Sequence, residues 1–146
     1  MRAARKSRAS LLGLGVIFVC AAVAAQDVVI VANKSIAVST ISPAQLRDVF
    51  TGARSRLDDG THAIPVLLKG GPVHEVFLRN HVGETPDEFR ARWRKAVFTG
   101  EGSMPKEFSS ESALLDYVAV TPGTIGYVSR INHQEADVKV LAVPTK

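Results

Sequence analysis

The sequence predicts a single α/β domain in which a mixed or parallel sheet is flanked by helices. The first observation is a continuous apolar, β-branched run over 28–31, which is typical of a strand buried on both faces. The second is that strand patterns and helix patterns alternate along the chain. The third is that the chain has a length suited to one hydrophobic core, and its sequence contains neither an internal repeat nor a linker.

The N-terminal segment has the pattern of a secretory signal peptide. Four basic residues occur among the first eight, and an uncharged, apolar run follows as far as Ala25. This run is shorter than a membrane-spanning helix, and the small residues at its end predict cleavage after Ala24 or Ala25. We therefore expect a periplasmic protein, with a signal peptide over 1–25 and one domain over 26–146. An uncleaved anchor is the alternative.

Charge and cysteine content exclude two classes of protein. The formal charge of +4 lies entirely in the predicted signal peptide, which leaves 14 basic and 14 acidic residues in the domain. A nearly neutral domain has no basic footprint for nucleic acid, so nucleic acid is excluded as a partner. The single cysteine, Cys20, also lies in the signal segment, so a disulfide-stapled domain is excluded.

Capping and turn residues place the next two elements. Ser42 at the N-cap, Pro43 at the first helical position and Gly52 as terminator predict a short amphipathic helix between them. A second strand is predicted over 63–68. Its N-terminal part should lie at a sheet edge, because Pro65 cannot donate a ladder hydrogen bond.

A longer helix is predicted from Pro86. Its apolar face is expected in the core and consists of Phe89, Trp93, Ala96 and Val97. Its basic face is interpreted as solvated surface and consists of Arg90, Arg92, Arg94 and Lys95. Phe98 is expected to pack with Phe89 and Trp93, and a recognition surface formed by these three rings is the alternative. A loop over 98–105, a helix that opens at 109–112 and strands over 125–128 and 138–143 complete the chain.

Several segments together resemble the type II periplasmic binding fold of phosphate ABC transporter substrate-binding proteins. These segments are 28–33, 41–52, 59–66, 93–100 and 122–128. Their order and spacing carry the resemblance over nearly the whole predicted domain. The resemblance implies a single lobe of that fold, in a short form, that binds phosphate reversibly and without catalysis.

In that family, a Gly-Ser-Gly-Thr-Arg type loop at a helix N-terminus holds the anion with backbone amides. The corresponding residues here are Gly70, Gly71, Pro72, Val73 and His74, which lack the two hydroxyls and the arginine. We expect anion contacts from the amides around Gly70, Gly71 and Val73, with His74 and Lys69 as charge partners. An ordinary strand-to-helix turn is the alternative, because turn chemistry alone explains two glycines and a proline.

Other site chemistry finds little support in the sequence. His62, His74, His81 and His133 lack the spacing of a zinc site, so we interpret them as surface or turn residues and expect neither metal nor cofactor. There is no Gly-x-Ser-x-Gly elbow, and we expect no enzymatic activity. The expected partners are a small inorganic anion such as phosphate, an ABC transporter permease or another envelope protein, and a second copy of the chain. An interaction module that has lost its ligand is the alternative function.

Overall fold

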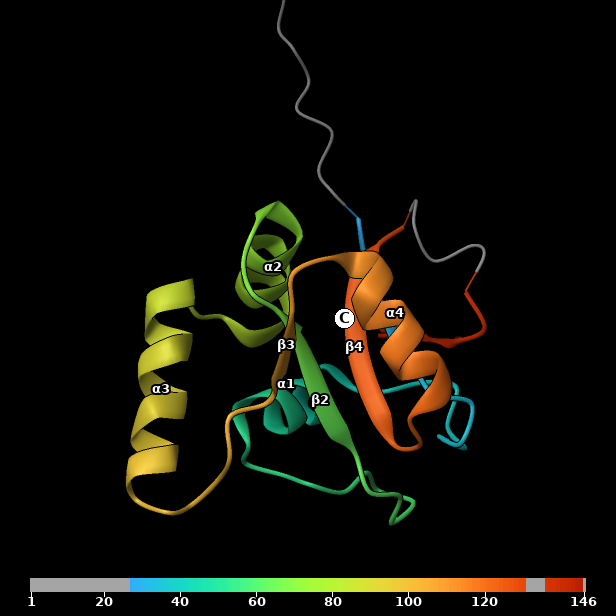
Figure 1. Cartoon of the computed structure of the whole chain (residues 1–146). Coiled ribbons are helices and arrows are strands. Elements are labelled where there is room, and N and C mark those ends of the chain that lie inside the picture. The colour runs from blue at the N-terminus through green and yellow to red at the C-terminus, as the bar shows by residue number, and fades with distance from the viewer. Residues whose placement is uncertain (1–26, 131–135, 146) are drawn as a thin grey trace, which may run out of the picture.

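The computed structural model of this chain describes residues 27–130 and 136–145 (Figure 1). The predicted signal peptide, its cleavage site and His133 lie outside the described residues.

Strands and helices alternate through most of the described chain, as predicted. In chain order the elements are β1 (Val28–Ala32), α1 (Pro43–Thr51), β2 (Ile64–Leu68), α2 (Pro72–Phe77), the π-helix η1 (Leu78–Val82), α3 (Pro86–Phe98), β3 (Lys106–Phe108), α4 (Glu111–Val120), β4 (Thr124–Ser129) and β5 (Lys139–Leu141). Within the described residues, no helix combines the length and the apolar character needed to cross a bilayer.

The strands form one mixed sheet, which confirms the predicted fold class. The strand order is β3-β2-β4-β1-β5. Strand β2 runs parallel to β3 and β4, whereas β1 runs antiparallel to β4 and β5. Pairing with β3 begins only at Val66, so Ile64 and Pro65 have β4 alone beside them in the described sheet. The local edge expected at Pro65 is therefore present.

Helices cover both faces of the sheet (Figure 1). On β4, Gly126 faces α4 so closely that a Cβ atom there would lie 2.8 Å from Leu114 Cδ2. The next residue, Tyr127, points to the opposite face, because successive strand side chains alternate. There its ring stacks on Phe77 of α2, with the ring centroids 3.8 Å apart. Helix α4 therefore lies on one face, and α1 and α2 lie on the other.

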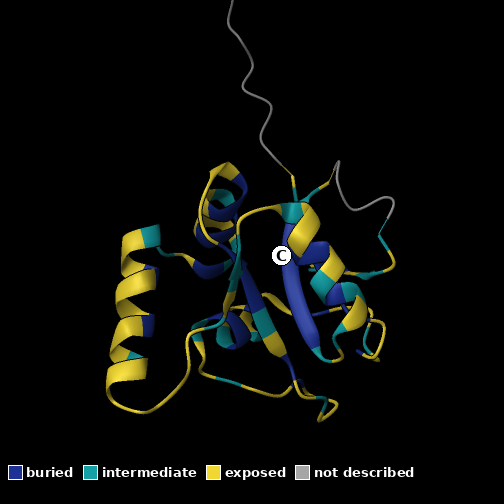
Figure 2. Ribbon diagram, in the orientation of Figure 1, coloured by how far each residue is buried: buried dark blue, intermediate teal, exposed yellow. Residues whose placement is uncertain are grey.

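On the α1 and α2 face, the core contains an aromatic cluster. Phe50, Phe77 and Tyr127 are fully buried. The rings of Phe50 and Phe77 meet edge to face, with centroids 4.7 Å apart. The buried apolar residues of the described chain run from Ile30 to Leu141 and form one hydrophobic cluster (Figure 2).

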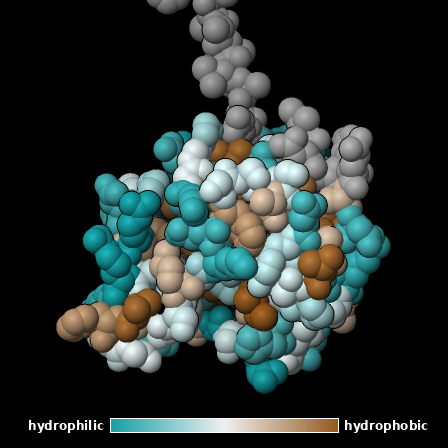
Figure 3. Space-filling view, in the orientation of Figure 1, coloured by the Kyte–Doolittle hydropathy of each residue, from teal (hydrophilic) through white to brown (hydrophobic). Residues whose placement is uncertain are grey.

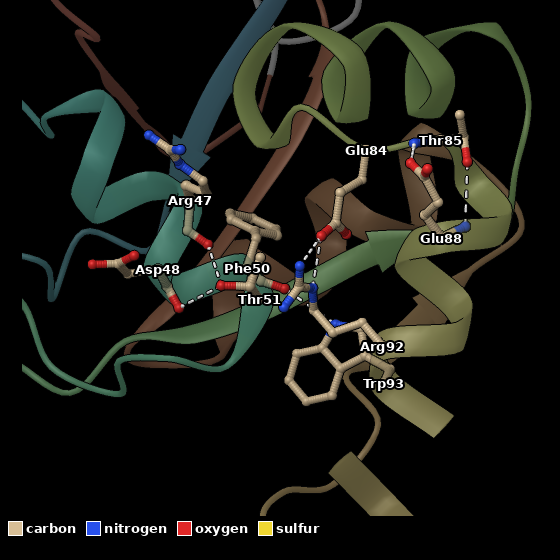
Figure 4. A network of polar contacts seen from close by, with 9 residues as sticks. All are labelled: Arg47, Asp48, Phe50, Thr51, Glu84, Thr85, Glu88, Arg92 and Trp93. Atoms are coloured by element: carbon tan, nitrogen blue, oxygen red, sulfur yellow. Dashed lines mark hydrogen bonds and ion pairs between the residues drawn. The ribbon is translucent and has the colours of Figure 1, made fainter. Parts of the chain in front are cut away.

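Helix α3 is held against α1 by a few specific contacts (Figure 4). Trp93 Nε1 donates a hydrogen bond to the backbone oxygen of Phe50 over 3.1 Å. The indole also covers Gly52, whose φ of 79° is the left-handed helix terminator predicted from sequence. A Cβ atom at Gly52 would lie only 2.8 Å from the indole, so this close approach requires glycine.

Only part of the apolar face predicted for α3 is buried. Phe89 and Trp93 are buried, but Val97 is exposed and the Phe98 side chain is 91% exposed. Phe98 follows Trp93 by five residues, which places it on a different side of a helix with 3.6 residues per turn. The expectation that Val97 and Phe98 pack in the core is therefore wrong. The basic residues of α3 are exposed, as predicted.

Candidate functional site

The carboxyl ends of β2 and β3 meet at one edge of the sheet. The two strands are parallel, Leu68 lies opposite Phe108, and Lys69 N donates to Phe108 O over 2.9 Å. After β2 the chain passes to α2 on one face, and after β3 it passes to α4 on the other. Connections that leave neighbouring parallel strands in opposite directions open a crevice, which is the usual ligand position in α/β sheets. The predicted loop of Lys69, Gly70 and Gly71 lies at this edge of the sheet, directly after β2.

The N-terminus of α2 lies at this edge of the sheet and has no side-chain cap. Its N-cap is Gly71, with a φ of 94°, which has no side chain to accept hydrogen bonds from the first-turn amides. By contrast, α1, α3 and α4 are capped by the side chains of Ser42, Thr85 and Ser110. The amides at the start of α2 therefore remain available to an external acceptor.

Lys69, Gly70 and Gly71 are exposed, whereas Val73 and His74 are buried. Helix α2 continues directly into η1, so the helical segment that starts at the loop extends to Val82. The loop is thus accessible from solvent while the residues after it are anchored in the core.

The start of α4, on the other face of the sheet, carries a negative charge. Ser110 Oγ caps α4 by accepting from Ala113 N over 3.1 Å. In the first turn of α4, the Glu111 carboxylate accepts hydrogen bonds from Ser129 N and Ser129 Oγ at the end of β4. A carboxylate already occupies this position, so an external anion is favoured at the α2 side instead.

His74 lies in the interior, not at the surface. Its side chain is buried, and Nδ1 lies 2.5 Å from the Tyr127 hydroxyl. The same hydroxyl accepts from Leu68 N over 3.0 Å, so we assign its proton to a hydrogen bond donated to His74 Nδ1. The interpretation of His74 as a surface or turn histidine is wrong, because the ring packs between the strand end and the aromatic core.

Both groups of this buried pair are held neutral. Burial lowers the pKa of His74, and the nearby positive charge of Arg90 lowers it further, against a smaller opposing effect of Glu75. Burial also raises the pKa of the Tyr127 hydroxyl. A neutral ring that accepts a hydrogen bond at Nδ1 stabilises the turn after β2 and carries no charge toward the loop.

We expect the free energy of unfolding to fall as the pH is lowered from about 7.5 to about 5. The pKa of His74 lies below its ordinary value of 6.5 in the folded protein, so the unfolded chain binds more protons below that pH. The contribution of the neutral His74 to the free energy of unfolding is therefore fully present above about pH 6.5 and is lost as the pH falls. Burial lowers the pKa of His81 as well, and acts in the same direction.

Urea denaturation of the wild type and of His74→Gln across this pH range measures the effect. The slope of stability against pH should be smaller in His74→Gln, whatever its overall stability. His62 is exposed, so His62→Gln should keep the wild-type slope. An unchanged slope in His74→Gln would show that His74 does not carry this dependence.

A separate groove of about 690 Å³ lies between the end of α1, the start of β2 and α3. Arg54 and Arg92 of this groove pair with Asp58 and Glu84, whereas Lys95 forms no ion pair within the described residues. The loop after β2 is preferred as the anion candidate because it lies at an uncapped helix N-terminus. In the described part of the chain, no group of three or more His, Cys, Asp and Glu side chains is placed to hold a metal ion.

Comparisons with known proteins agree on the fold. No family model and no curated protein matches the chain. Among solved structures, a putative phosphate ABC transporter substrate-binding protein with bound phosphate from Clostridium perfringens matches with a TM-score of 0.62 and 15% identity, over 81% of this chain and 45% of that one. PstS from Borrelia burgdorferi matches with a TM-score of 0.61 and 14% identity, over 83% and 48% of the two chains.

A possible phosphate binding protein from Planctomyces limnophilus also matches, with a TM-score of 0.58 and 11% identity, over 82% of this chain and 42% of that one. The resemblance to phosphate ABC transporter substrate-binding proteins is therefore confirmed at the level of the fold. The chain spans less than half the length of each of these structures. Its architecture is that of one lobe of a periplasmic binding protein.

Two features of the site were not recognised from sequence. The contact between Lys69 and Phe108 depends on β3, a three-residue strand with two charged residues that gave no strand signal. The partner of His74, Tyr127, is 53 residues away along the chain. An isolated tyrosine in an otherwise apolar strand is a weak sign that its hydroxyl has a buried partner.

Proposed function

We propose that the chain is a periplasmic solute-binding protein that binds a small oxyanion, phosphate in the first instance, reversibly and without catalysis. The observation that carries the proposal is the uncapped N-terminus of α2 at the carboxyl ends of β2 and β3. Free amides and the helix dipole attract an anion at such a position. The solved structures of similar fold, described as phosphate-binding or phosphate-transport proteins, support this choice of ligand.

Five residues make up the proposed site. Lys69 is exposed beside the loop and supplies the positive charge. The backbone amides of Gly70, Gly71, Val73 and His74 supply directional hydrogen bonds, and Pro72 supplies none. Because the His74 ring is engaged with Tyr127, its contribution is assigned to its amide.

The affinity of this site alone should be modest. Lys69, Gly70 and Gly71 are exposed, so water competes for every polar contact. A second chain that covered the loop would exclude that water. In this proposal the cover is a transporter permease, another envelope protein or a second copy of the lobe.

Isothermal titration with phosphate tests the proposal, using a chain that begins at Gln26. Lys69→Gln removes the single cation of the loop and should weaken binding about threefold to tenfold, as expected for a charge-assisted contact in water. Lys95→Gln on α3 is the matched control, because it removes an equivalent exposed charge elsewhere. Equal losses in both variants, or no heat at millimolar phosphate, would contradict an anion site at this loop.

The alternative function is an interaction module in the cell envelope that has lost ligand binding. The observation that favours it is the exposed apolar group of Val97, Phe98 and Met104 at the end of α3. This alternative function is favoured if titration detects no anion binding.

A further inference from the structure

The C-terminal end of α3 presents apolar side chains to solvent beside positive charge. We call Val97, Phe98 and Met104 the tip patch. Phe98 is 91% exposed, Val97 is 48% exposed and Met104 is 40% exposed. Together with Trp93 and Arg94 they line a shallow notch of about 390 Å³. Figure 3 shows apolar side chains that protrude at this corner of the molecule.

The basic residues of α3 lie next to the tip patch. Arg90, Arg94 and Phe98 follow one another at four-residue spacing, so they lie along one side of the helix. Arg90, Arg94 and Lys95 form no ion pair within the described residues, whereas Arg92 is paired with Glu84. The loop after Phe98 holds one carboxylate, Glu101, which lines the separate groove near α1 together with Lys95, whereas Arg94 lines the notch at the tip patch.

The orientation of α3 is fixed, so this side cannot turn inward. Trp93 donates a hydrogen bond to the backbone oxygen of Phe50, and Arg92 donates one to the carboxylate of Glu84, just before the helix (Figure 4). The Thr85 hydroxyl and the Glu88 carboxylate form a capping box at its start. These contacts fix the rotation of α3, so that Arg90, Arg94 and Phe98 stay exposed.

We infer that this surface docks the protein on an anionic phospholipid membrane. The ring of Phe98 enters the boundary between headgroups and acyl chains, and Arg94, Lys95 and Arg90 contact lipid phosphates. An aromatic ring among cations on an amphipathic helix is the usual chemistry of interfacial binding. A second copy is disfavoured as the occupant, because this face would bring its own unpaired cations together.

This inference concerns a surface distinct from the proposed phosphate loop. The two can fail independently, because neither Phe98 nor Lys95 belongs to the proposed anion site. The export predicted from the sequence would place the domain next to a membrane surface.

Vesicle sedimentation tests the inference, with a chain that begins at Gln26 so that the apolar leader does not contribute. Phosphatidylcholine vesicles with phosphatidylglycerol should bind the protein at low salt, and vesicles of phosphatidylcholine alone should bind it much less. Added salt should weaken binding, because exposed charges are screened. The single tryptophan, Trp93, lines the notch, so its emission should change when vesicles bind.

Two pairs of variants decide which residues carry the binding. Phe98→Ser should lower the partition coefficient at least tenfold, as expected for an aromatic side chain that leaves an apolar environment. Val120→Ser is its control, since Val120 is 78% exposed on α4. Lys95→Gln should lower the partition coefficient about fivefold. Arg47→Gln on α1 should have little effect.

Three results would overturn the inference. The first is the absence of binding to anionic vesicles at low salt, and the second is an equal loss in Phe98→Ser and Val120→Ser. The third is a Phe98-dependent dimer in sedimentation velocity without vesicle binding, which would make a second copy the occupant.

Discussion

Replacing Phe77 with alanine is expected to lower the free energy of unfolding by about 3–5 kcal/mol, the usual cost of removing a buried aromatic ring. Phe77 is fully buried. Its ring stacks on Tyr127 with an interplanar angle of 4° and meets Phe50 edge to face. The variant would leave a cavity between α1, α2 and β4, and the rings around it are too closely packed to collapse into it.

Urea denaturation followed by circular dichroism measures this loss. A domain stability of about 5–15 kcal/mol is typical, so a loss of this size takes up most of the stability at the lower end of that range. Phe77→Leu therefore provides a milder second measurement. Val120→Ala is the control, because an exposed valine should contribute less than about 0.5 kcal/mol. A loss below about 1 kcal/mol in Phe77→Ala would mean that the aromatic cluster is not the centre of the core.

Tyr127→Phe is expected to cost about 2–4 kcal/mol, although it removes only one oxygen atom. The stacking on Phe77 is preserved, but Leu68 N and His74 Nδ1 both lose their hydrogen-bond partner. Each buried group left without a partner costs about 1–3 kcal/mol. Because Leu68 ends β2 and His74 lies in α2, the loss should loosen the turn that presents the candidate loop.

Tyr117→Phe is the matched control for this prediction. Tyr117 is half-buried against Phe108, and its hydroxyl makes no hydrogen bond among the described residues. Its removal should change stability by less than about 0.5 kcal/mol. Equal stability of Tyr127→Phe and wild type would rule out a structural role for the hydroxyl. Hydrogen exchange at the Leu68 amide should be faster in Tyr127→Phe if the local argument holds.

Much of the fold could be predicted because its local signals are strong. Ser42, Pro43 and Gly52 bound α1 as expected, and Pro72 begins α2. Strand β3 could not be predicted, because it has only three residues, two of them charged, and so shows no alternation of apolar and polar residues. It exists through pairing with β2, which is a tertiary effect.

The candidate site was also predictable only where it depends on local sequence signals. The loop of Lys69, Gly70 and Gly71 was recognisable from turn residues ahead of a helix. The burial of His74 was not, since it depends on Tyr127 in a strand distant along the chain. Val97 was misplaced because helical spacing predicts a buried face only where another element covers the helix. Phe98 was misplaced because it follows Trp93 by five residues and so lies on another side of α3.

The position of β1 in the sheet determines when the molecule can fold. Strand β1 pairs with β4 and β5, and the side chain of Asn33 at its end donates to Val118 O, 85 residues away. During synthesis, β1 therefore has no strand partner until β4 and β5 have emerged. Contacts so distant in sequence make folding slow, because a long loop must close before they form.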